Sequence, residues 1–292
     1  SLGALAVGEK RCLETIAQYG AKTFIDCQEA MQEYSDTKTR DVIRRLRDGV
    51  YDFWDFVDDD MVTNIPIRVR LRLTVKDGTL HFDLTGTDPQ VEAAYNIPTM
   101  GTLHNMLTRR ITTFIRTHDK SIPVNAGMYR PMGITSPPGT VLNAEFPDAV
   151  GVRFTTATLF NNAVTGALLK ADNTMMAGST CGTGGSVVLT EFLPGEIAAT
   201  VTIVQSLRGG MSAYNGMDGV DVRDVTMNTM HNHPIETIEN KCGVRIMEYD
   251  VRTDSCGAGQ WRGGAGQVMT VEILRDGGTI QLRGMDRFRF AP

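Results

Sequence analysis

The stretch Ile67-Arg-Val-Arg-Leu-Arg-Leu-Thr-Val75 alternates strictly between apolar and polar side chains. Successive side chains of a strand point to opposite faces, so the apolar residues share one face and the arginines share the other. Asp77-Gly78 follows, a dipeptide typical of tight hairpin turns, and leads into a second strand-like segment over residues 79–84. The sequence therefore predicts an antiparallel hairpin with one buried face. Its arginine face is expected to be solvated or to meet a partner, with an anion site as the alternative.

The residues before this hairpin follow helical spacing instead. Leu5, Leu13 and Ile16 fall near helical periodicity, and Gly20 is placed like the glycine that follows a helix C-terminus. A second helix is expected to begin near Thr23 and to stop at Asp48-Gly49. Residues 1–50 are therefore predicted to be a helical segment, either a helical hairpin or a long broken helix.

The residues after the hairpin mix helical and strand-like segments, with no internal repeat. Residues 99–117 and 154–171 are expected to be helices, the second tightly packed because many of its residues are small. Residues 121–150 are rich in proline and are expected to be a long ordered loop. The predicted class is α+β: an N-terminal helical hairpin followed by mixed, largely antiparallel sheets with glycine-rich loops, with residues 51–292 as one α+β body.

Composition limits the function classes. The chain has 292 residues, 41% hydrophobic and 22% charged, which is typical of a globular protein. A net charge of −5 gives no general attraction to nucleic acid or to an anionic membrane, and no apolar run is long enough to span a bilayer. The five cysteines form no CxxC pair and are expected to be reduced thiols. We therefore expect a cytoplasmic protein that binds neither nucleic acid nor membrane.

The tract DSCGAGQWRGGAG, residues 254–266, places five glycines between strand-like segments at residues 244–251 and 267–274. Glycines held between strands indicate positive φ or close backbone approach, and the alternative is that their amides hold an anion. Other glycine loops lie at residues 182–185 and 209–210. No Gly-Lys-Ser/Thr and no strand-to-helix GxGxxG accompanies these loops, so nucleotide binding by this chain alone is disfavoured.

Polar side chains gather in the segment His231-Asn-His-Pro-Ile-Glu236. Two histidines two residues apart, followed by a glutamate, are able to bind a metal or to shuttle protons. Pro234 indicates a loop, however, and the other histidines are scattered, so a surface or interface cluster is favoured. Asp83 ends the predicted hairpin, where it stabilises a turn or faces a substrate. No nucleophile elbow or cysteine-protease signature is present, so no catalytic nucleophile is assigned.

Six segments, taken in order, resemble the hydantoinase B/oxoprolinase family, which includes acetone and acetophenone carboxylase large subunits and ATP-dependent lactam hydrolases. Together they extend over nearly the whole chain. They are FDLTGTDPQ (82–90), NAGMYRPM (125–132), PPGTVLN with FP (137–147), GGMSAYNGMDG (209–219), NHPIE (232–236) and the tract 254–266.

This resemblance implies a subunit of an ATP-dependent, multi-subunit cytoplasmic enzyme. Its reaction would be hydrolysis of a cyclic amide (a hydantoin, oxoproline or a lactam) or carboxylation of a ketone. In the family a hydantoinase A-like partner subunit with an actin-like ATPase fold uses ATP to activate the small-molecule substrate. Members are typically longer and carry a metal site in a leading half. The divalent metal (Zn, Mn or Mg) is therefore expected on another chain or on a separate metal-bearing half, and neither metal ligands nor cofactor-binding residues are assigned here.

This chain is expected to form a shaped wall of the site and a subunit interface. Its candidate polar site residues are Asp83, Asn125, Asn232 and Glu236. Around them, Trp261 is expected to be packed and Arg262 to contact a partner. The competing hypothesis is a non-catalytic scaffold subunit that binds a complete homologous subunit. Amide hydrolysis and carboxylation both stay open, as does whether the shorter length is natural.

Overall fold

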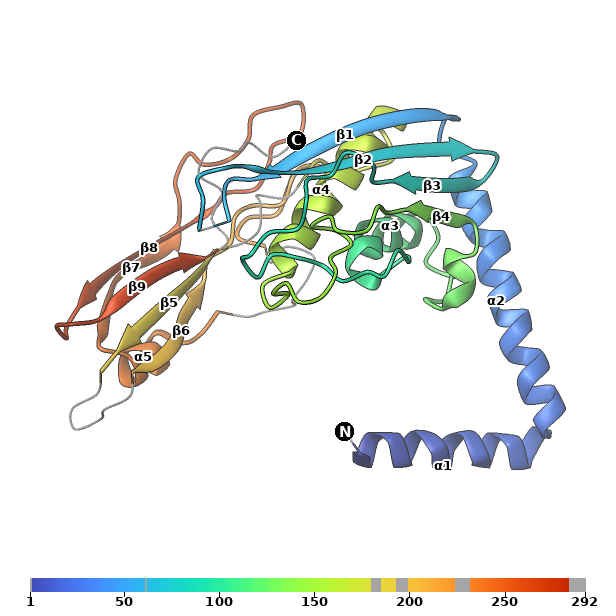
Figure 1. Cartoon of the computed structure of the whole chain (residues 1–292), viewed down its shortest axis with the longest axis horizontal. Coiled ribbons are helices and arrows are strands. Elements are labelled where there is room, and N and C mark those ends of the chain that lie inside the picture. Colours follow the sequence, from blue (N-terminus) through green and yellow to red (C-terminus); the bar gives the residue numbers. More distant parts are fainter. Residues whose placement is uncertain (1, 61, 180–184, 193–198, 224–231, 284–292) are drawn as a thin grey trace.

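The computed structural model describes residues 2–60, 62–179, 185–192, 199–223 and 232–283. Two bodies follow one another along the long axis of the molecule (Figure 1). The first combines helices α1 to α4 with a four-stranded sheet, and the second combines five strands with α5. Each body has its own hydrophobic core, the larger one in the first body. The predicted α+β class with mixed sheets is confirmed, while the boundary at residue 50 stays a prediction.

The first sheet has the strand order β1-β2-β3-β4. Its strands are β1 (Gly49–Val57), β2 (Ile67–Lys76), β3 (Thr79–Asp83) and β4 (Met132–Thr135). The first three are antiparallel, whereas β4 runs parallel to β3. The predicted hairpin is confirmed, because β2 buries every second residue and the turn residues Asp77 and Gly78 have φ of 42° and 72°.

The arginine face of β2 finds its counter-ions inside the chain. Arg72 donates two hydrogen bonds to the Asp52 carboxylate on β1, at 3.0 and 3.2 Å, and Arg70 donates a third at 3.3 Å. Arg68 lies 3.4 Å from the Asp88 carboxylate. The hydrogen bond from Arg72 and the nearby arginine charges hold the pKa of Asp52 below its ordinary value. The face is therefore an internally paired, half-exposed surface.

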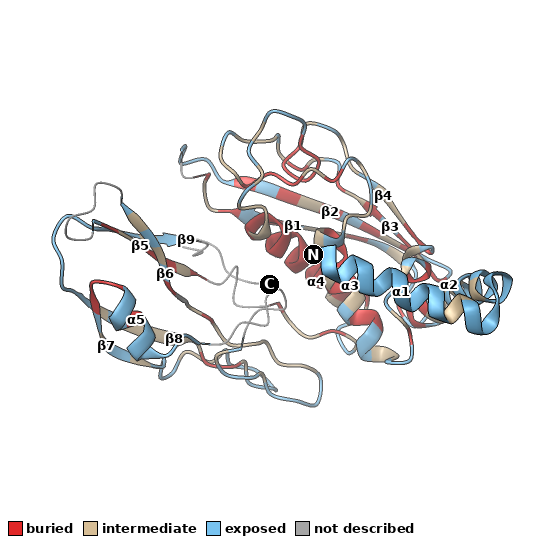
Figure 2. Cartoon of the chain, turned by 90° about the horizontal axis from the view of Figure 1, so that it is seen from below, coloured by how far each residue is buried: buried red, intermediate tan, exposed pale blue. Residues whose placement is uncertain are grey.

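Helix α4 (Phe154–Ala171) crosses the face of this sheet and packs on β1 and β2. Nearly all its residues are buried, including polar ones (Figure 2). Gly166 allows the closest contact, since a Cβ at this position would stand 2.4 Å from the Phe53 ring. The prediction of a tightly packed helix over residues 154–171 is confirmed.

Helix α3 (Asn105–His118) packs on α4 through an inserted side chain. Asn161 of α4 accepts a hydrogen bond from the Arg110 amide (2.7 Å) and donates one to the Met106 carbonyl (2.8 Å). These are the two backbone groups that a regular helical turn joins to each other. The carboxamide therefore fixes the position of α3 along α4.

The N-terminal helices α1 (Leu2–Tyr19) and α2 (Ala21–Ile43) meet at Gly20, where φ is 83°. They diverge there (Figure 1), so the segment has the form of a broken helix. No residue of α1 is buried, whereas the C-terminal end of α2 reaches the first core through Val42 and Ile43. α2 ends at Ile43 rather than at Asp48-Gly49, because residues 44–48 turn the chain into β1.

The second body contains only antiparallel pairs among its described strands. Strands β5 (Ser186–Glu191), β6 (Thr200–Ser206) and β9 (Thr279–Arg283) form a sheet of order β6-β5-β9. Strands β7 (Val244–Val251) and β8 (Gln267–Ile273) form a separate ribbon, and α5 (Ile235–Lys241) contributes to the shared core. That core consists of Val187, Leu189, Val204, Ile238, Cys242 and Val244.

Residues 121–150 contain regular secondary structure that the predicted ordered loop did not include. They contain the short 3-10 helix η1 (Ala126–Tyr129) and strand β4, which pairs with β3 in the register Leu80↔Met132. Strand β4 has only four residues, too few to show an alternation of apolar and polar side chains in the sequence. Its pairing with β3 is what identifies it as a strand. The described cysteines Cys12, Cys27, Cys242 and Cys256 are free thiols, and Cys181 lies outside the described residues. None of the described helices is both long and apolar enough to cross a bilayer.

We expect Gly166→Ala to lower the free energy of unfolding by about 1–3 kcal/mol, because the added methyl group displaces the Phe53 ring in a filled core. Gly8→Ala in α1 is the matched control: nothing lies within 4 Å of a Cβ there, so it should raise helix stability by about 0.5–1 kcal/mol. Urea unfolding of both variants measures the difference. Equal effects would contradict the packing described for α4.

Candidate functional site

Two glycine-rich segments, residues 209–223 and 254–266, lie against each other through their backbones. The Gly264 amide donates to the Met211 carbonyl at 2.8 Å. A Cβ on Gly210 would stand 1.8 Å from the carbonyl oxygen of Gly264, so only glycine fits at this crossing. The close backbone approach predicted for the tract is confirmed, and it takes place within the chain.

The amides at the end of this tract are already engaged. From Arg262 to Gly266, each N–H group donates to an acceptor in the chain: in order, Asp218, Gly257, Met211, Asp221 and Ser255. An anion cradle requires amides that point at a ligand, so residues 262–266 do not form one. Gln260 and Trp261, which precede this part of the tract, are exposed, and the prediction that Trp261 is packed is wrong because 37% of its surface stays accessible.

Gln260 and Trp261 form one wall of a groove of about 410 Å³, which we call the Trp261 groove. Its second wall is the end of α4 and the loop after it. The third wall comes from the segment 213–215, which belongs to the other glycine-rich segment. The remaining lining residues are Leu169, Asn173, Thr174, Met176, Gly178, Ala213, Tyr214 and Asn215.

Hydrogen bonds within and between segments hold the walls of the Trp261 groove. Tyr214 and Met217 exchange two backbone hydrogen bonds, at 3.0 and 2.9 Å, around a tight turn at Asn215-Gly216 in which Gly216 has φ of 91°. The Ser212 hydroxyl donates to the Gly178 carbonyl at 2.6 Å and so ties this segment to the loop after α4. The groove is thus built from three segments that are distant in the sequence.

The lining of the Trp261 groove is neutral. Three carboxamides, those of Asn173, Asn215 and Gln260, offer both donors and acceptors, and the indole of Trp261 offers a flat apolar face. No carboxylate, histidine, cysteine or lysine belongs to its lining residues. Such a set binds and orients a neutral polar ligand, whereas it lacks a group able to act as acid, base or nucleophile near neutral pH.

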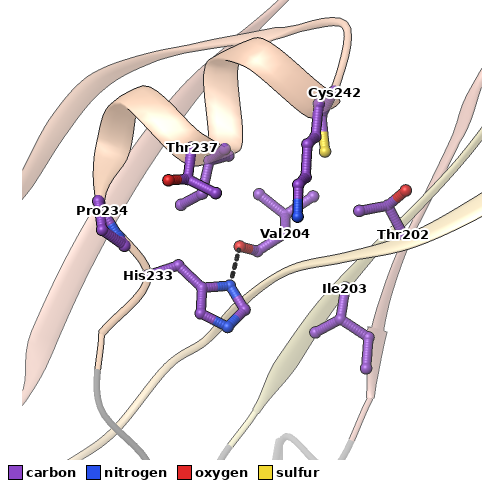
Figure 3. Close-up of a pocket in the computed structure, with 9 residues that line it drawn as sticks. Thr202, Ile203, Val204, His233, Pro234, Thr237 and Cys242 are labelled. Atoms are coloured by element: carbon purple, nitrogen blue, oxygen red, sulfur yellow. Dashed lines mark hydrogen bonds between the residues drawn. The ribbon is translucent and has the colours of Figure 1, made fainter.

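A second pocket, of about 190 Å³, lies between α5 and β6 (Figure 3). Its lining includes His233, whose Nδ1 lies 3.4 Å from the Val204 carbonyl oxygen, and Cys242 at the end of α5. Burial, and then the negative charge of Glu191, raise the pKa of the Cys242 thiol. The thiol therefore stays protonated at neutral pH and is a poor nucleophile or metal ligand.

The candidates Asp83 and Asn125 lie in the first body, where both cap local structure. Asp83 accepts a hydrogen bond from the Thr85 amide at 2.9 Å. Partial burial acts to raise the pKa of Asp83, but hydrogen bonds from Thr85 and the charge of Arg72 outweigh it and leave the pKa below its ordinary value. Asn125 accepts from the Gly127 amide at 3.0 Å and so caps η1.

Asn232 and Glu236 lie in the second body. The Asn232 carboxamide accepts a hydrogen bond from the Arg208 guanidinium, and Glu236 occupies the exposed first turn of α5. His231, the first histidine of the predicted cluster, lies outside the described residues, as do residues 180–184 of the first glycine loop. Two of the four candidates therefore belong to the first body and two to the second, so the structure does not bring them together in one site.

The sequence did not single out Asn173, Tyr214 or Asn215, which share the Trp261 groove with Trp261 itself. The Asn215-Gly216 dipeptide is a signal for an exposed tight turn, but nothing local places that turn beside α4. Arg262 lies 4.0 Å from the Asp221 carboxylate and remains exposed, and its contact with a partner stays a prediction. In the described part of the chain, no three His, Cys, Asp or Glu side chains gather as a metal site would require.

Comparison with known proteins places these features in a family. The family model for hydantoinase B/oxoprolinase matches residues 1–292. The putative B-type subunit of a D-/L-hydantoinase from Pseudomonas sp. (strain NS671) is 32% identical over 283 residues, which is 94% of this chain and 47% of the relative. The chain therefore spans about half the length of this curated relative.

Solved structures share the fold. The ATP-dependent caprolactamase from Pseudomonas jessenii superimposes with a TM-score of 0.75 at 22% identity, over 93% of this chain and 47% of the other. A nucleotide-free acetone carboxylase superimposes with a TM-score of 0.73 at 15% identity, over 91% of this chain and 37% of the other. The ordered glycine-rich segments, the fold and the family model agree, and the chain belongs to the hydantoinase B/oxoprolinase family.

Proposed function

We propose that this chain is part of the B-type subunit of an ATP-dependent, multi-subunit enzyme that hydrolyses a cyclic amide. The family match over residues 1–292 carries the proposal. The names of the relatives support it, since they include the B-type subunit of a hydantoinase, the beta subunit of a caprolactamase and 5-oxoprolinases. Carboxylation of a ketone is the runner-up, supported by the fold shared with acetone carboxylase.

Under this proposal the chain contributes a binding wall. The carboxamides of the Trp261 groove offer both donors and acceptors, which complements the N–H and C=O of a cyclic amide; a simple ketone offers only an acceptor. The Trp261 indole lies beside them as a flat face against which a planar ring can pack. These two features favour the amide over the ketone as the occupant.

We propose that ATP and the divalent metal (Zn, Mn or Mg) bind outside the described residues of this chain. The residues described here do not fit a metal, because no three carboxylate, imidazole or thiol groups gather. The amides of residues 262–266 are engaged within the chain and do not fit a nucleotide phosphate. We propose that ATP acts on an actin-like, hydantoinase A-like partner subunit and that the metal lies on another chain or on a separate half of the B-type subunit.

The four polar candidates keep a role in this proposal as groups that shape the wall and the subunit interface. Asp83, Asn125 and Asn232 hold local structure through the hydrogen bonds described above, and Glu236 is exposed on α5. The exposed apolar side chains of α1 and early α2 supply further area for assembly with another polypeptide. They are Leu2, Leu5, Val7, Leu13, Tyr19 and Ile25.

We expect the enzyme purified with its partner subunits to hydrolyse a hydantoin, 5-oxoproline or caprolactam in an ATP-dependent reaction. Product formation and ADP release, measured with and without each amide, test this directly. Carboxylation of acetone with bicarbonate is the parallel assay for the runner-up. An assembled complex that is inactive with every amide and with acetone would contradict both.

We expect Trp261→Ala to raise the KM for the amide roughly tenfold with little change in kcat, because it removes a packing surface and no chemical group. Trp54→Ala is the matched control, since Trp54 is the chain's other tryptophan and is exposed on β1, away from the groove. Steady-state kinetics of both variants separate binding from turnover. A Trp261→Ala enzyme with unchanged KM would remove the groove from the proposal.

The second candidate function is a non-catalytic scaffold that binds a complete homologous subunit. The observation that favours it is α1, a helix of 18 residues with none buried. Under the leading proposal, Asp83→Ala or Glu236→Ala should lower turnover per assembled complex. Loss of assembly with normal turnover in the complex that remains would favour the scaffold. Size-exclusion chromatography paired with the activity assay distinguishes the two.

A further inference from the structure

Arg110 is a buried cation without a counter-ion among the described residues. It lies in the second turn of α3 and is only 7% exposed. Its guanidinium makes no hydrogen bond and no ion pair with any residue that the structure describes. Burial lowers its pKa from 12.5 to about 10, which leaves it charged at neutral pH. A charge in this position keeps little contact with solvent and has no anionic partner among the described residues.

Other arginines of this chain show what such compensation looks like. Arg72 donates to Asp52 at 3.0 Å, and Arg275 donates at 3.0 Å to Glu191, a carboxylate that is 2% exposed. Each of these two arginines therefore has a carboxylate within hydrogen-bonding distance. At Arg110 the corresponding position is left for a group from outside the described chain.

The backbone of Arg110 is fixed rather than mobile. Its amide donates to the Asn161 carboxamide at 2.7 Å, and Asn161 is itself 5% exposed on α4. Asn161 also donates to the carbonyls of Met106 and Ala157, so it joins two helices around this point. The side chain thus extends from a fixed backbone position, and its burial limits the freedom that it has left to lose when an anion binds.

The start of α3 supplies no negative charge to Arg110. His104, the residue that caps the helix, has its pKa lowered by burial and then by the positive charge of Arg153. Its Nδ1 accepts a hydrogen bond from the Met106 amide at 3.2 Å. The surroundings known from these contacts therefore provide no anionic group to Arg110.

We propose that Arg110 anchors a binding site for a small oxyanion, a carboxylate or a phosphate, that reaches it from outside the chain. A guanidinium matches either group because its N–H donors form a planar fork that meets two oxygens at once. Arg110 keeps 7% of its surface exposed, and a small ion would reach it there. This inference does not depend on the proposed function, since it concerns one side chain and its missing counter-ion.

The test is thermal unfolding of the protein purified in its native assembly, titrated with sodium phosphate or sodium acetate against sodium chloride of equal ionic strength. The Tm of the wild type should rise by roughly 2–4 °C at about five times the Kd of the bound anion. Arg110→Met should abolish that rise. Arg116→Met should keep it, because Arg116 lies on the same helix and is exposed, and its loss changes the net charge equally.

A further outcome separates a binding role from a structural one. Without added anion, Arg110→Met should unfold at the wild-type temperature or above, since it removes an uncompensated buried charge. Arg110→Lys, which keeps the charge but not the fork, should respond to the anion more weakly than the wild type. A rise with acetate alone identifies a carboxylate, and a rise with phosphate alone identifies a phosphate. No rise with either anion, an unchanged rise in Arg110→Met, or a lower Tm for Arg110→Met in anion-free buffer would overturn the proposal.

Discussion

The burial of α4 against β1 and β2 is the interaction on which the rest of the structure depends. The helix is rich in small residues and almost wholly buried, and Gly166 lets it approach the Phe53 ring at a distance that any side chain would prevent. Once it is seated, Asn161 fixes α3 beside it and sets the position of Arg110. Its C-terminal end then supplies one wall of the Trp261 groove. Helix α4 therefore supports the first sheet, the position of Arg110 and one wall of the Trp261 groove.

The second constraint is the crossing of two glycine-rich segments. Backbone contacts as short as those at Gly210 and Gly264 are open only to residues without a side chain. The amides of residues 262–266 are engaged partly across this crossing and partly within the tract, so they are not available to an anion. Gln260 and Trp261, which precede them, line the groove opposite the end of α4. The glycines thus allow the two backbones to approach closely, while the neighbouring side chains of Gln260 and Trp261 line the groove.

Three features of the described residues agree with the proposed role in substrate binding. The Trp261 groove is neutral, the Cys242 thiol is kept protonated by burial, and the described residues gather no metal site. In the proposed function this suits a B-type subunit in which the described residues hold a substrate while ATP and the metal act elsewhere in the complex. Helix α1 exposes apolar side chains and has no buried residue, which marks it as a candidate contact surface.

The sequence by itself determined the elements whose signals are local. Strict alternation and Asp77-Gly78 predicted the β2–β3 hairpin, a run rich in small residues predicted α4, and six ordered segments indicated the family. Only the tertiary structure decided that β4 pairs parallel to β3 and that the Asn161 side chain hydrogen-bonds to the backbone of α3. It also decided that Arg110 has no counter-ion among the described residues and that Trp261 lines a groove with the end of α4. These arrangements depend on residues far apart in the chain. A short strand or a single carboxamide has no periodicity, so its partner is fixed only when the whole chain packs.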